Sequence, residues 1–118
     1  MVVDNSKIVR DRISTLVSTL PDVHVSSFDV SEYKYGHACE KVAPNIIIIS
    51  SDDASPICMS RFKNLKKENP ELVGIVLTNK PYEEYEIQWR NVGAEFYFDK
   101  STEFEKILDV CGTTESVA

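Results

Sequence analysis

Short runs of apolar residues alternate along the chain with longer stretches in which apolar residues recur every three or four positions. The first pattern is typical of buried strands and the second of amphipathic helices. The predicted strands are 1–3, 23–28, 45–50, 72–78 and 95–98, and the predicted helices are 6–20, 31–43, 57–68, 81–93 and 101–112. Five strands that alternate with five helices predict an α/β fold, a doubly wound parallel sheet with helices on both faces.

The most apolar of the predicted strands is a run of four isoleucines, 46–49, followed by Ser50, Ser51, Asp52 and Asp53. A continuous β-branched run is typical of a parallel strand that is buried on both faces. Ligand sites in such sheets gather at the carboxyl ends of the strands. Here these ends are residues 4–5, 50–53, 78–79 and 99–100, so we expect the functional residues among them.

Length and composition narrow the range of functions. The 118 residues predict one domain, 1–111, followed by a small, polar and flexible tail, 112–118. The formal charge is −6 without a basic block, which argues against nucleic-acid binding. The isoleucine run is far shorter than the roughly 20 residues of a membrane span. Three widely spaced cysteines form no CxxC pair, so we expect free thiols and a cytoplasmic location.

Four segments carry a likeness to a known family: "VVDNSKIVRDRISTLVSTLPDVHV", "APNIIIISSDDASP", "GIVLTNK" and "VGAEFYFDKS". Together they resemble the receiver domain of two-component response regulators over residues 2–110. The most specific part is "GA-x-x-Y-x-x-K", formed here by Gly93, Ala94, Tyr97 and Lys100. The resemblance implies the flavodoxin-like (βα)5 receiver fold. The first helix is similar to that of receivers that precede helix-turn-helix output domains.

The resemblance also implies roles for single residues. In the family, an acidic pair after the first strand holds Mg²⁺, and an aspartate after the third strand accepts a phosphoryl group. A hydroxyl residue after the fourth strand and a lysine after the fifth contact that group, and a nearby aromatic residue acts as a switch. Carried over, the acidic pair falls on Asp4 and Asn5, the phosphoacceptor on Ser50, the phosphoryl contacts on Thr78 and Lys100, and the switch on Tyr97. The chain thus departs from the family at the residue that would form the covalent bond.

Asp52 is the alternative phosphoacceptor. It lies four residues before Pro56, as in the D-x-x-x-P turn of the family, whereas the spacings to the other site residues fit the family with Ser50. Moving the site from Ser50 to Asp52 would displace the carboxylate by about 6.6 Å along a straight strand. Contact with Thr78 and Lys100 would then be lost unless a bulge absorbed two residues. Both assignments stay open at this point.

The charge of the predicted site bears on metal binding. With Asn5 and Ser50 in place of carboxylates, Asp4 and Lys100 sum to zero rather than the −2 of the family. Two missing carboxylates remove roughly 16 kcal/mol of raw attraction for a divalent ion at an effective ε near 20. We therefore expect no metal and no other cofactor, with Lys100 either paired with Asp4 or turned outward; Mg²⁺ would bind only under the Asp52 alternative. No base is placed beside Ser50, so we expect no enzymatic activity.

These observations favour a degenerate receiver that acts as a protein-interaction module in two-component-type signalling. The resemblance implies that the fourth helix, fifth strand and fifth helix dock an output domain, a kinase or a second copy. Tyr82, Tyr85 and Trp89 are the interface candidates there, although their helical spacing is also typical of core residues. A flavodoxin-like domain that binds a small ligand is a further alternative, disfavoured by the lack of a glycine-rich phosphate loop.

Overall fold

The computed structural model describes residues 1–36, 42–52 and 55–117, with side chains as far as residue 112. Within these residues, five parallel strands form one sheet in the order β2-β1-β3-β4-β5. The strands are β1 (Val2–Val3), β2 (Ser27–Phe28), β3 (Ile46–Ser50), β4 (Val73–Thr78) and β5 (Phe96–Asp99). The helices are α1 (Lys7–Val17), α2 (Val30–Tyr35), α4 (Pro56–Glu68), α5 (Glu83–Asn91) and α6 (Lys106–Val117). The doubly wound α/β fold is therefore confirmed.

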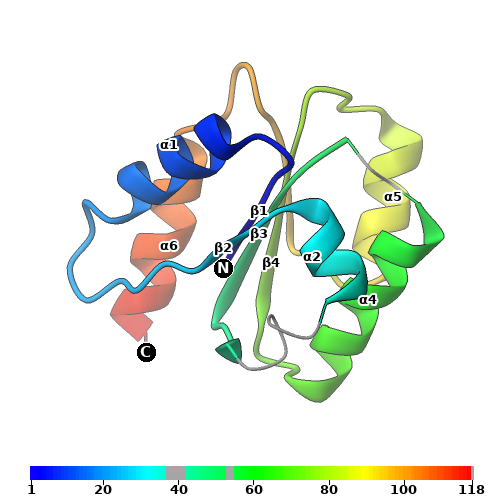
Figure 1. Cartoon of the computed structure of the whole chain (residues 1–118), viewed down its shortest axis with the longest axis horizontal. Coiled ribbons are helices and arrows are strands. Elements are labelled where there is room, and N and C mark those ends of the chain that lie inside the picture. The colour runs from blue at the N-terminus through cyan, green and yellow to red at the C-terminus, as the bar shows by residue number, and fades with distance from the viewer. Residues whose placement is uncertain (37–41, 53–54, 118) are drawn as a thin grey trace.

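Helices cover both faces of this sheet. Helices α1 and α6 lie side by side on one face, and α2, α4 and α5 cover the other (Figure 1). Because side chains alternate along a strand, Ile47 and Ile49 pack on the side of α2 and α4, whereas Ile48 packs on the side of α1 and α6. This accounts for the uninterrupted isoleucine run, since both faces of β3 are buried.

The register of the strands brings their carboxyl ends to one edge of the sheet. Val3 lies opposite Ile49, and Thr78 lies opposite Asp99. All five strands are parallel, so the residues that follow β1, β3, β4 and β5 meet at the upper end of the molecule in Figure 1. The fold thus places the residues that the sequence singled out at a common end of the sheet.

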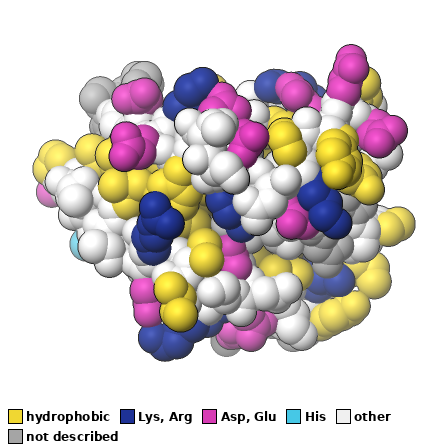
Figure 2. Space-filling view, turned by 90° about the horizontal axis from the view of Figure 1, so that it is seen from above, with side chains coloured by type: hydrophobic (Ala, Val, Ile, Leu, Met, Phe, Trp, Pro, Cys, Tyr) yellow, Lys and Arg dark blue, Asp and Glu magenta, His cyan; other side chains and the backbone are white. Residues whose placement is uncertain are grey.

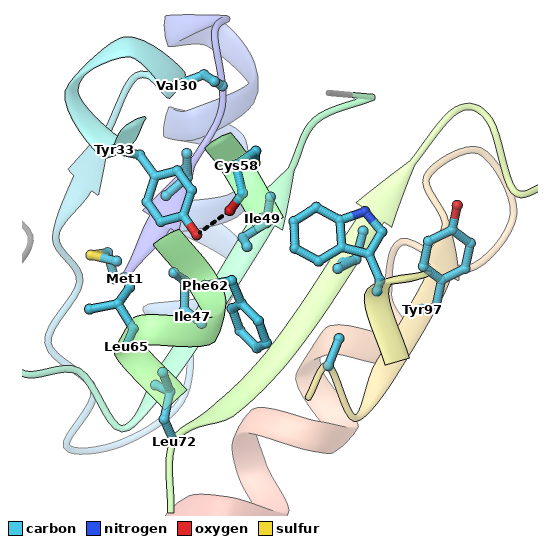
Figure 3. Packing of buried hydrophobic residues seen from close by; sticks show 14 residues of the cluster. Met1, Val30, Tyr33, Ile47, Ile49, Cys58, Phe62, Leu65, Leu72 and Tyr97 are labelled. Carbon is cyan, nitrogen blue, oxygen red and sulfur yellow. Dashed lines mark hydrogen bonds between the residues drawn. The ribbon is translucent and has the colours of Figure 1, made fainter. Parts of the chain in front are cut away.

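The larger of the two cores lies under α2, α4 and α5 (Figure 3). In it the Tyr33 hydroxyl donates a hydrogen bond of 3.3 Å to the Cys58 carbonyl. The rings of Phe62 and Trp89 meet edge to face, with centroids 5.9 Å apart. The Phe62 ring also lies directly over β4, where a Cβ added at Gly74 would approach it to 2.3 Å. Glycine at this position therefore makes room for the aromatic pair.

The C-terminal part of the chain differs from the sequence-based prediction. The last helix does not begin at Ser101, because residues 99–103 form a turn. The Ser101 amide donates to the Asp99 carboxylate at 2.8 Å, and the Glu103 amide donates to the Asp99 carbonyl at 2.8 Å. Helix α6 begins only at Lys106 and continues past Gly112 to Val117. The segment predicted as a flexible tail is thus helical as far as Val117.

The segment around β2 also differs. Strand β2 pairs with β1 over Ser27 and Phe28 only, and α2 ends at Tyr35, with Gly36 as its C-cap. The rest of the helix predicted over 31–43 falls largely on residues 37–41, which lie outside the described part of the chain. Among the described residues, no helix combines the length and the apolar character that crossing a membrane requires.

Candidate functional site

Asp4 follows β1 and is held by three contacts at the carboxyl edge of the sheet. The residue is buried, with 5% of its surface exposed. One carboxylate oxygen accepts a hydrogen bond from the Ser6 amide at 2.8 Å, and the other lies 3.3 Å from Lys100 Nζ. The Asp4 carbonyl accepts a hydrogen bond from the Arg10 guanidinium at 2.6 Å. Of the two expected placements of Lys100, pairing with Asp4 is the one observed, and this ion pair joins the ends of β1 and β5.

Asn5, the second member of the predicted acidic pair, is exposed beside Asp4. The N-cap of α1 is its neighbour Ser6, whose hydroxyl accepts a hydrogen bond from the Val9 amide at 3.3 Å. Ser6, rather than Asn5, therefore caps the first helix.

Ser50 ends β3 with its side chain buried. It is 1% exposed, and its hydroxyl has no hydrogen-bond partner within the described part of the chain. Because Val3 lies opposite Ile49, the next residues along the two strands, Asp4 and Ser50, are neighbours in the register. Alternation puts the Ser50 side chain on the same face as Ile48, toward α1 and α6. A neutral hydroxyl therefore stands beside the Asp4–Lys100 pair.

Asp52 lies beyond the end of β3 and contacts the end of β4. A single carboxylate oxygen, Oδ1, accepts two hydrogen bonds. One comes from the Thr78 hydroxyl at 2.6 Å and the other from the Asn79 amide at 2.8 Å. The expectation that Asp52 would lie out of reach of Thr78 is wrong. It assigned the contact with Thr78 to position 50 alone, whereas Ser50 lies opposite Leu77 and the Ser51 amide donates to the Leu77 carbonyl at 3.1 Å, so the chain continues alongside the end of β4.

Further hydrogen bonds link Thr78 to Tyr97 on β5 through the backbone of Lys80. Thr78 is 3% exposed, and its side-chain oxygen accepts a hydrogen bond from the Lys80 amide at 2.9 Å. The Lys80 carbonyl in turn accepts a hydrogen bond from the Tyr97 hydroxyl at 3.0 Å. Tyr97 is 9% exposed and belongs to the core cluster drawn in Figure 3, and its burial raises the pKa of the phenol. Asp52, Thr78, Lys80 and Tyr97 thus form one chain of hydrogen bonds.

The environment of Asp52 favours its charged form. Partial burial acts to raise the pKa of Asp52, but the hydrogen bonds from Thr78 and Asn79 and the positive charges of Lys100 and Lys80 outweigh it and lower the pKa below its usual value. Seen from above, toward the end where the strands finish, basic and acidic side chains lie next to one another (Figure 2). The carboxylate therefore stays ionised at neutral pH.

This lowered pKa predicts a pH dependence of stability. A carboxylate whose pKa is depressed by folding stabilises the folded state above its unfolded pKa, near 3.8, and loses that contribution as the pH falls through the folded value. Urea denaturation at pH 5 and pH 3 should therefore show a smaller loss of stability for Asp52→Asn than for the wild type. The pKa of Glu103 is also lowered, mainly by Lys106, but Glu103 is present in both proteins, so its contribution cancels when their losses of stability are compared. Equal losses in the two proteins would contradict the role of Asp52.

The aromatic residues of α5 divide between the core and the surface. Trp89 is 2% exposed and packs against Phe62, so its prediction as an interface residue is wrong. Tyr85 is partly buried against the same core, whereas Tyr82 is 52% exposed. The sequence did not single out Ile87, which is also 52% exposed. Its position two residues before the buried Trp89 was the available signal, because residues two apart on a helix do not share a face.

The site residues do not match the ligands that Mg²⁺ prefers. One oxygen of Asp4 accepts a backbone amide and the other faces Lys100, while Asn5 and Ser50 carry no charge. Among the residues that the structure describes, no group of three or more His, Cys, Asp or Glu side chains is arranged to hold a metal ion. The geometry instead offers an internal ion pair and an exposed carboxylate fixed by Thr78.

Comparison with known proteins places this geometry in a fold family. No protein-family model matches the chain, and no curated protein matches it either. Among solved structures, the beryllofluoride-activated DrrB receiver domain is similar with a TM-score of 0.79 and 18% identity, over 98% of this chain and 94% of that one. A LuxR-family DNA-binding response regulator from Staphylococcus aureus is similar with a TM-score of 0.76 and 12% identity, over 96% and 95%.

A third similar structure is an atypical orphan response regulator, described as having a phosphorylation-independent regulatory mechanism. Its TM-score is 0.72 at 14% identity, over 95% of this chain and 92% of that chain. At such identities these likenesses establish the fold. The flavodoxin-like fold of receiver domains is therefore confirmed for this chain, whose described residues form five parallel strands and five helices.

Proposed function

We propose that this chain, which has the fold of response-regulator receiver domains, is an atypical receiver that works as a protein-interaction module in two-component-type signalling and is not switched by phosphorylation. The observation that carries the proposal is the Asp4–Lys100 ion pair beside the buried, neutral Ser50. Lys100 neutralises Asp4, and Ser50 supplies no carboxylate to accept a phosphoryl group. We propose further that the chain is cytoplasmic, catalyses no reaction and holds no cofactor.

The contacts of Thr78 support the same proposal. In the receiver family this hydroxyl contacts the phosphoryl group, but here it donates a hydrogen bond to the Asp52 carboxylate at 2.6 Å. The Asp52 carboxylate thus supplies a permanent negative group to Thr78, and the hydrogen bonds continue through Lys80 to Tyr97. A domain built this way holds Tyr97 inward without a covalent modification. The atypical orphan regulator described above offers a parallel, since phosphorylation-independent regulation is ascribed to it.

A second candidate function rests on the same carboxylate. Asp52 is exposed, hydrogen-bonded to Thr78 and within the electrostatic influence of Lys100, and these are features of a phosphoacceptor. Under this alternative, Asp52 would accept the phosphoryl group and Mg²⁺ would bind nearby. Asp4 would then have to release Lys100 to serve as a ligand.

Treatment with a small phosphodonor separates the two functions. Acetyl phosphate with Mg²⁺ should leave the mass of the wild-type chain unchanged, and beryllofluoride with Mg²⁺ should leave its amide NMR spectrum unchanged. A phosphorylated species that disappears in Asp52→Asn but persists in Ser50→Ala would overturn the proposal in favour of Asp52. A species that disappears only in Ser50→Ala would contradict both candidates, since neither gives Ser50 a reactive hydroxyl.

The exposed part of α5 is the surface that we propose for partner binding. Tyr82, the N-cap of α5, and Ile87 are each 52% exposed, and the first turn of the helix carries Glu83, Glu84 and Glu86, of which Glu86 is paired with Arg90 at 2.8 Å. Apolar anchors within a charged rim are typical of protein interfaces. The acidic rim favours a partner with a basic surface, such as a kinase or an output domain.

A further inference from the structure

A hollow of about 290 Å³ opens at the amino edge of the sheet, the end opposite to the candidate functional site. Four parts of the chain line it: Met1 just before β1, Ile46 at the start of β3, Val17 at the end of α1 and Cys111 on α6. The volume is close to the lower limit for small-molecule sites, roughly 300 Å³. None of the described residues that line it belongs to the candidate functional site, so the hollow is a separate feature of the molecule.

Aliphatic side chains form the floor of this hollow. Val2, Val17 and Ile48 are buried, and Val25 and Ile46 are half-buried beside them. All five belong to the core on the side of α1 and α6 or pack against it, so the floor is held in place by the fold. An aliphatic group that enters the hollow leaves water and contacts these side chains, which is favourable.

Four polar side chains stand around the aliphatic floor: Asp22, His24 and Asn45 are exposed, and Ser26 is half-buried. None of these four side chains makes a hydrogen bond or an ion pair with another described residue. An apolar hollow with a few convergent polar groups is typical of a ligand site. When histidine is counted as neutral, Asp22 carries the only charge among the described side chains that line the hollow.

The backbone beside the hollow takes an unusual conformation at two positions. Among the described residues, Asp22 with a φ of 60° and Ala43 with a φ of 47° are the non-glycine residues with positive φ, and both line the hollow. Aspartate adopts this left-handed conformation more readily than most residues do, whereas alanine has no side chain that favours it. Strained backbone of this kind clusters at ligand-binding positions. The strain thus points to the same place as the lining does.

Met1 also lines the hollow, but its amino group contributes little positive charge there. It donates a hydrogen bond of 2.8 Å to the Ile46 carbonyl. Burial lowers the pKa of this amino group to about 6, so most of it is neutral at pH 7.5. The Asp22 carboxylate therefore determines the sign of the charge at the hollow, and the net charge of −6 on the whole chain adds to its attraction for cations.

We propose that this hollow binds a small hydrophobic amine in its protonated form. The ammonium group donates charge-assisted hydrogen bonds to the Asp22 carboxylate, and the aliphatic part lies against Val17, Val25 and Ile46. Asp22 repels a carboxylate ligand, and an alcohol of the same length gains no ionic contact with it. The site goes beyond the proposed function, since it shares no residue with the candidate site at the carboxyl edge of the sheet.

Titration of the ¹⁵N-labelled chain with hexylamine at pH 7.5, followed by amide NMR, tests this site. We expect shifts at Val17, Val25 and Ile46, with a Kd on the order of 1 mM, as is usual for a ligand this small. 1-Hexanol should bind at least fivefold more weakly than hexylamine, because it lacks the charge. Hexanoate should bind at least tenfold more weakly, because its charge is of the same sign as that of Asp22.

Asp22→Asn is the main variant, because asparagine also suits the left-handed backbone but carries no charge. It should raise the Kd for hexylamine at least fivefold and change the Kd for 1-hexanol less than twofold. Asp11→Asn removes the same charge from an exposed position on α1, where Asp11 pairs with Lys7, and should change the Kd for hexylamine less than twofold. Val25→Phe should fill the hollow and abolish the binding of both compounds. If Val25→Phe does not fold, Asp22→Asn decides alone.

A wild-type chain without amide shifts at about 10 mM hexylamine would overturn the proposal. So would hexanoate that binds as tightly as hexylamine, or equal losses of affinity in Asp22→Asn and Asp11→Asn, since net charge would then be the cause. Shifts confined to the carboxyl edge of the sheet would also overturn it, because the amine would then bind near Asp52. The phosphodonor experiment depends on none of these variants, so the amine site and the proposed function can fail separately.

Discussion

Replacing Trp89 by alanine should lower the free energy of unfolding by about 3–5 kcal/mol, the usual cost of removing a large side chain from a packed core. The side chain is 2% exposed in the core beneath α4 and α5. Its edge-to-face contact with Phe62 contributes about 0.5–1.5 kcal/mol beyond the burial of apolar area. Phe62 would be left facing a cavity, because the Gly74 backbone beneath it offers no side chain to fill the space.

Urea denaturation followed by far-UV circular dichroism measures this loss, since the variant removes the chain's one tryptophan and with it the fluorescence probe. Tyr82→Ala is the matched control: it truncates another aromatic residue of the same region, but at 52% exposure it should change the stability by less than about 0.5 kcal/mol. If Trp89→Ala lowers the free energy of unfolding by less than about 1 kcal/mol, Trp89 is not an essential core residue and becomes a candidate for partner binding again.

The double substitution Asn5→Asp, Ser50→Asp should produce the second large effect. Without Mg²⁺, we expect it to lower the free energy of unfolding by about 3 kcal/mol, because position 50 is 1% exposed and a new carboxylate there adjoins Asp4. Lys100 is the cation in contact with Asp4, and it cannot neutralise three carboxylates. The crowded negative charges should instead attract a divalent ion, which binds oxygen ligands.

Adding about 10 mM MgCl₂ should then restore about 1.4 kcal/mol to the double variant if the Kd is about 1 mM, and should leave the wild type unchanged. Ser50→Asn is the control of similar shape without charge, and its stability should not respond to Mg²⁺. A double variant that is insensitive to Mg²⁺ would contradict the assignment of Ser50 to the family's acidic pocket. A wild type that is stabilised by Mg²⁺ would contradict the proposed function.

The sequence predicted the parts of the site that are fixed by strand order. Asp4 and Lys100 follow the first and last strands, 96 residues apart, and their ion pair was one of two expected outcomes, because parallel strands end at one edge of the sheet. The spacing of the GA-x-x-Y-x-x-K segment identified Lys100 as a site residue, and the opposite charge of Asp4 made Asp4 its expected partner. The roles of Ser50 and Asp52 as phosphoacceptor positions stay predictions.

The contact between Asp52 and Thr78 could not be predicted, since it depends on the register of β3 against β4. Ser50 lies opposite Leu77, and the Ser51 amide donates to the Leu77 carbonyl, so Asp52 comes within 2.6 Å of the Thr78 hydroxyl. A pattern of apolar residues indicates two strands but not which of their residues lie opposite one another. The start of the last helix was also not determined by the local pattern, because contacts of the Asp99 carboxylate and carbonyl hold a turn and α6 begins only at Lys106.

By itself, the sequence determined the fold class, the two-sided burial of β3 and the edge of the sheet where polar residues gather, because these follow from hydrophobic periodicity and from the alternation of strands and helices. Only the tertiary structure decided that Trp89 belongs to the core, that Asp52 reaches Thr78 and that Ile8 stands exposed beside a groove. Each of these depends on which neighbour a side chain meets across elements distant in sequence. A local pattern records that a residue is apolar or charged, but not what lies opposite it once the helices have packed.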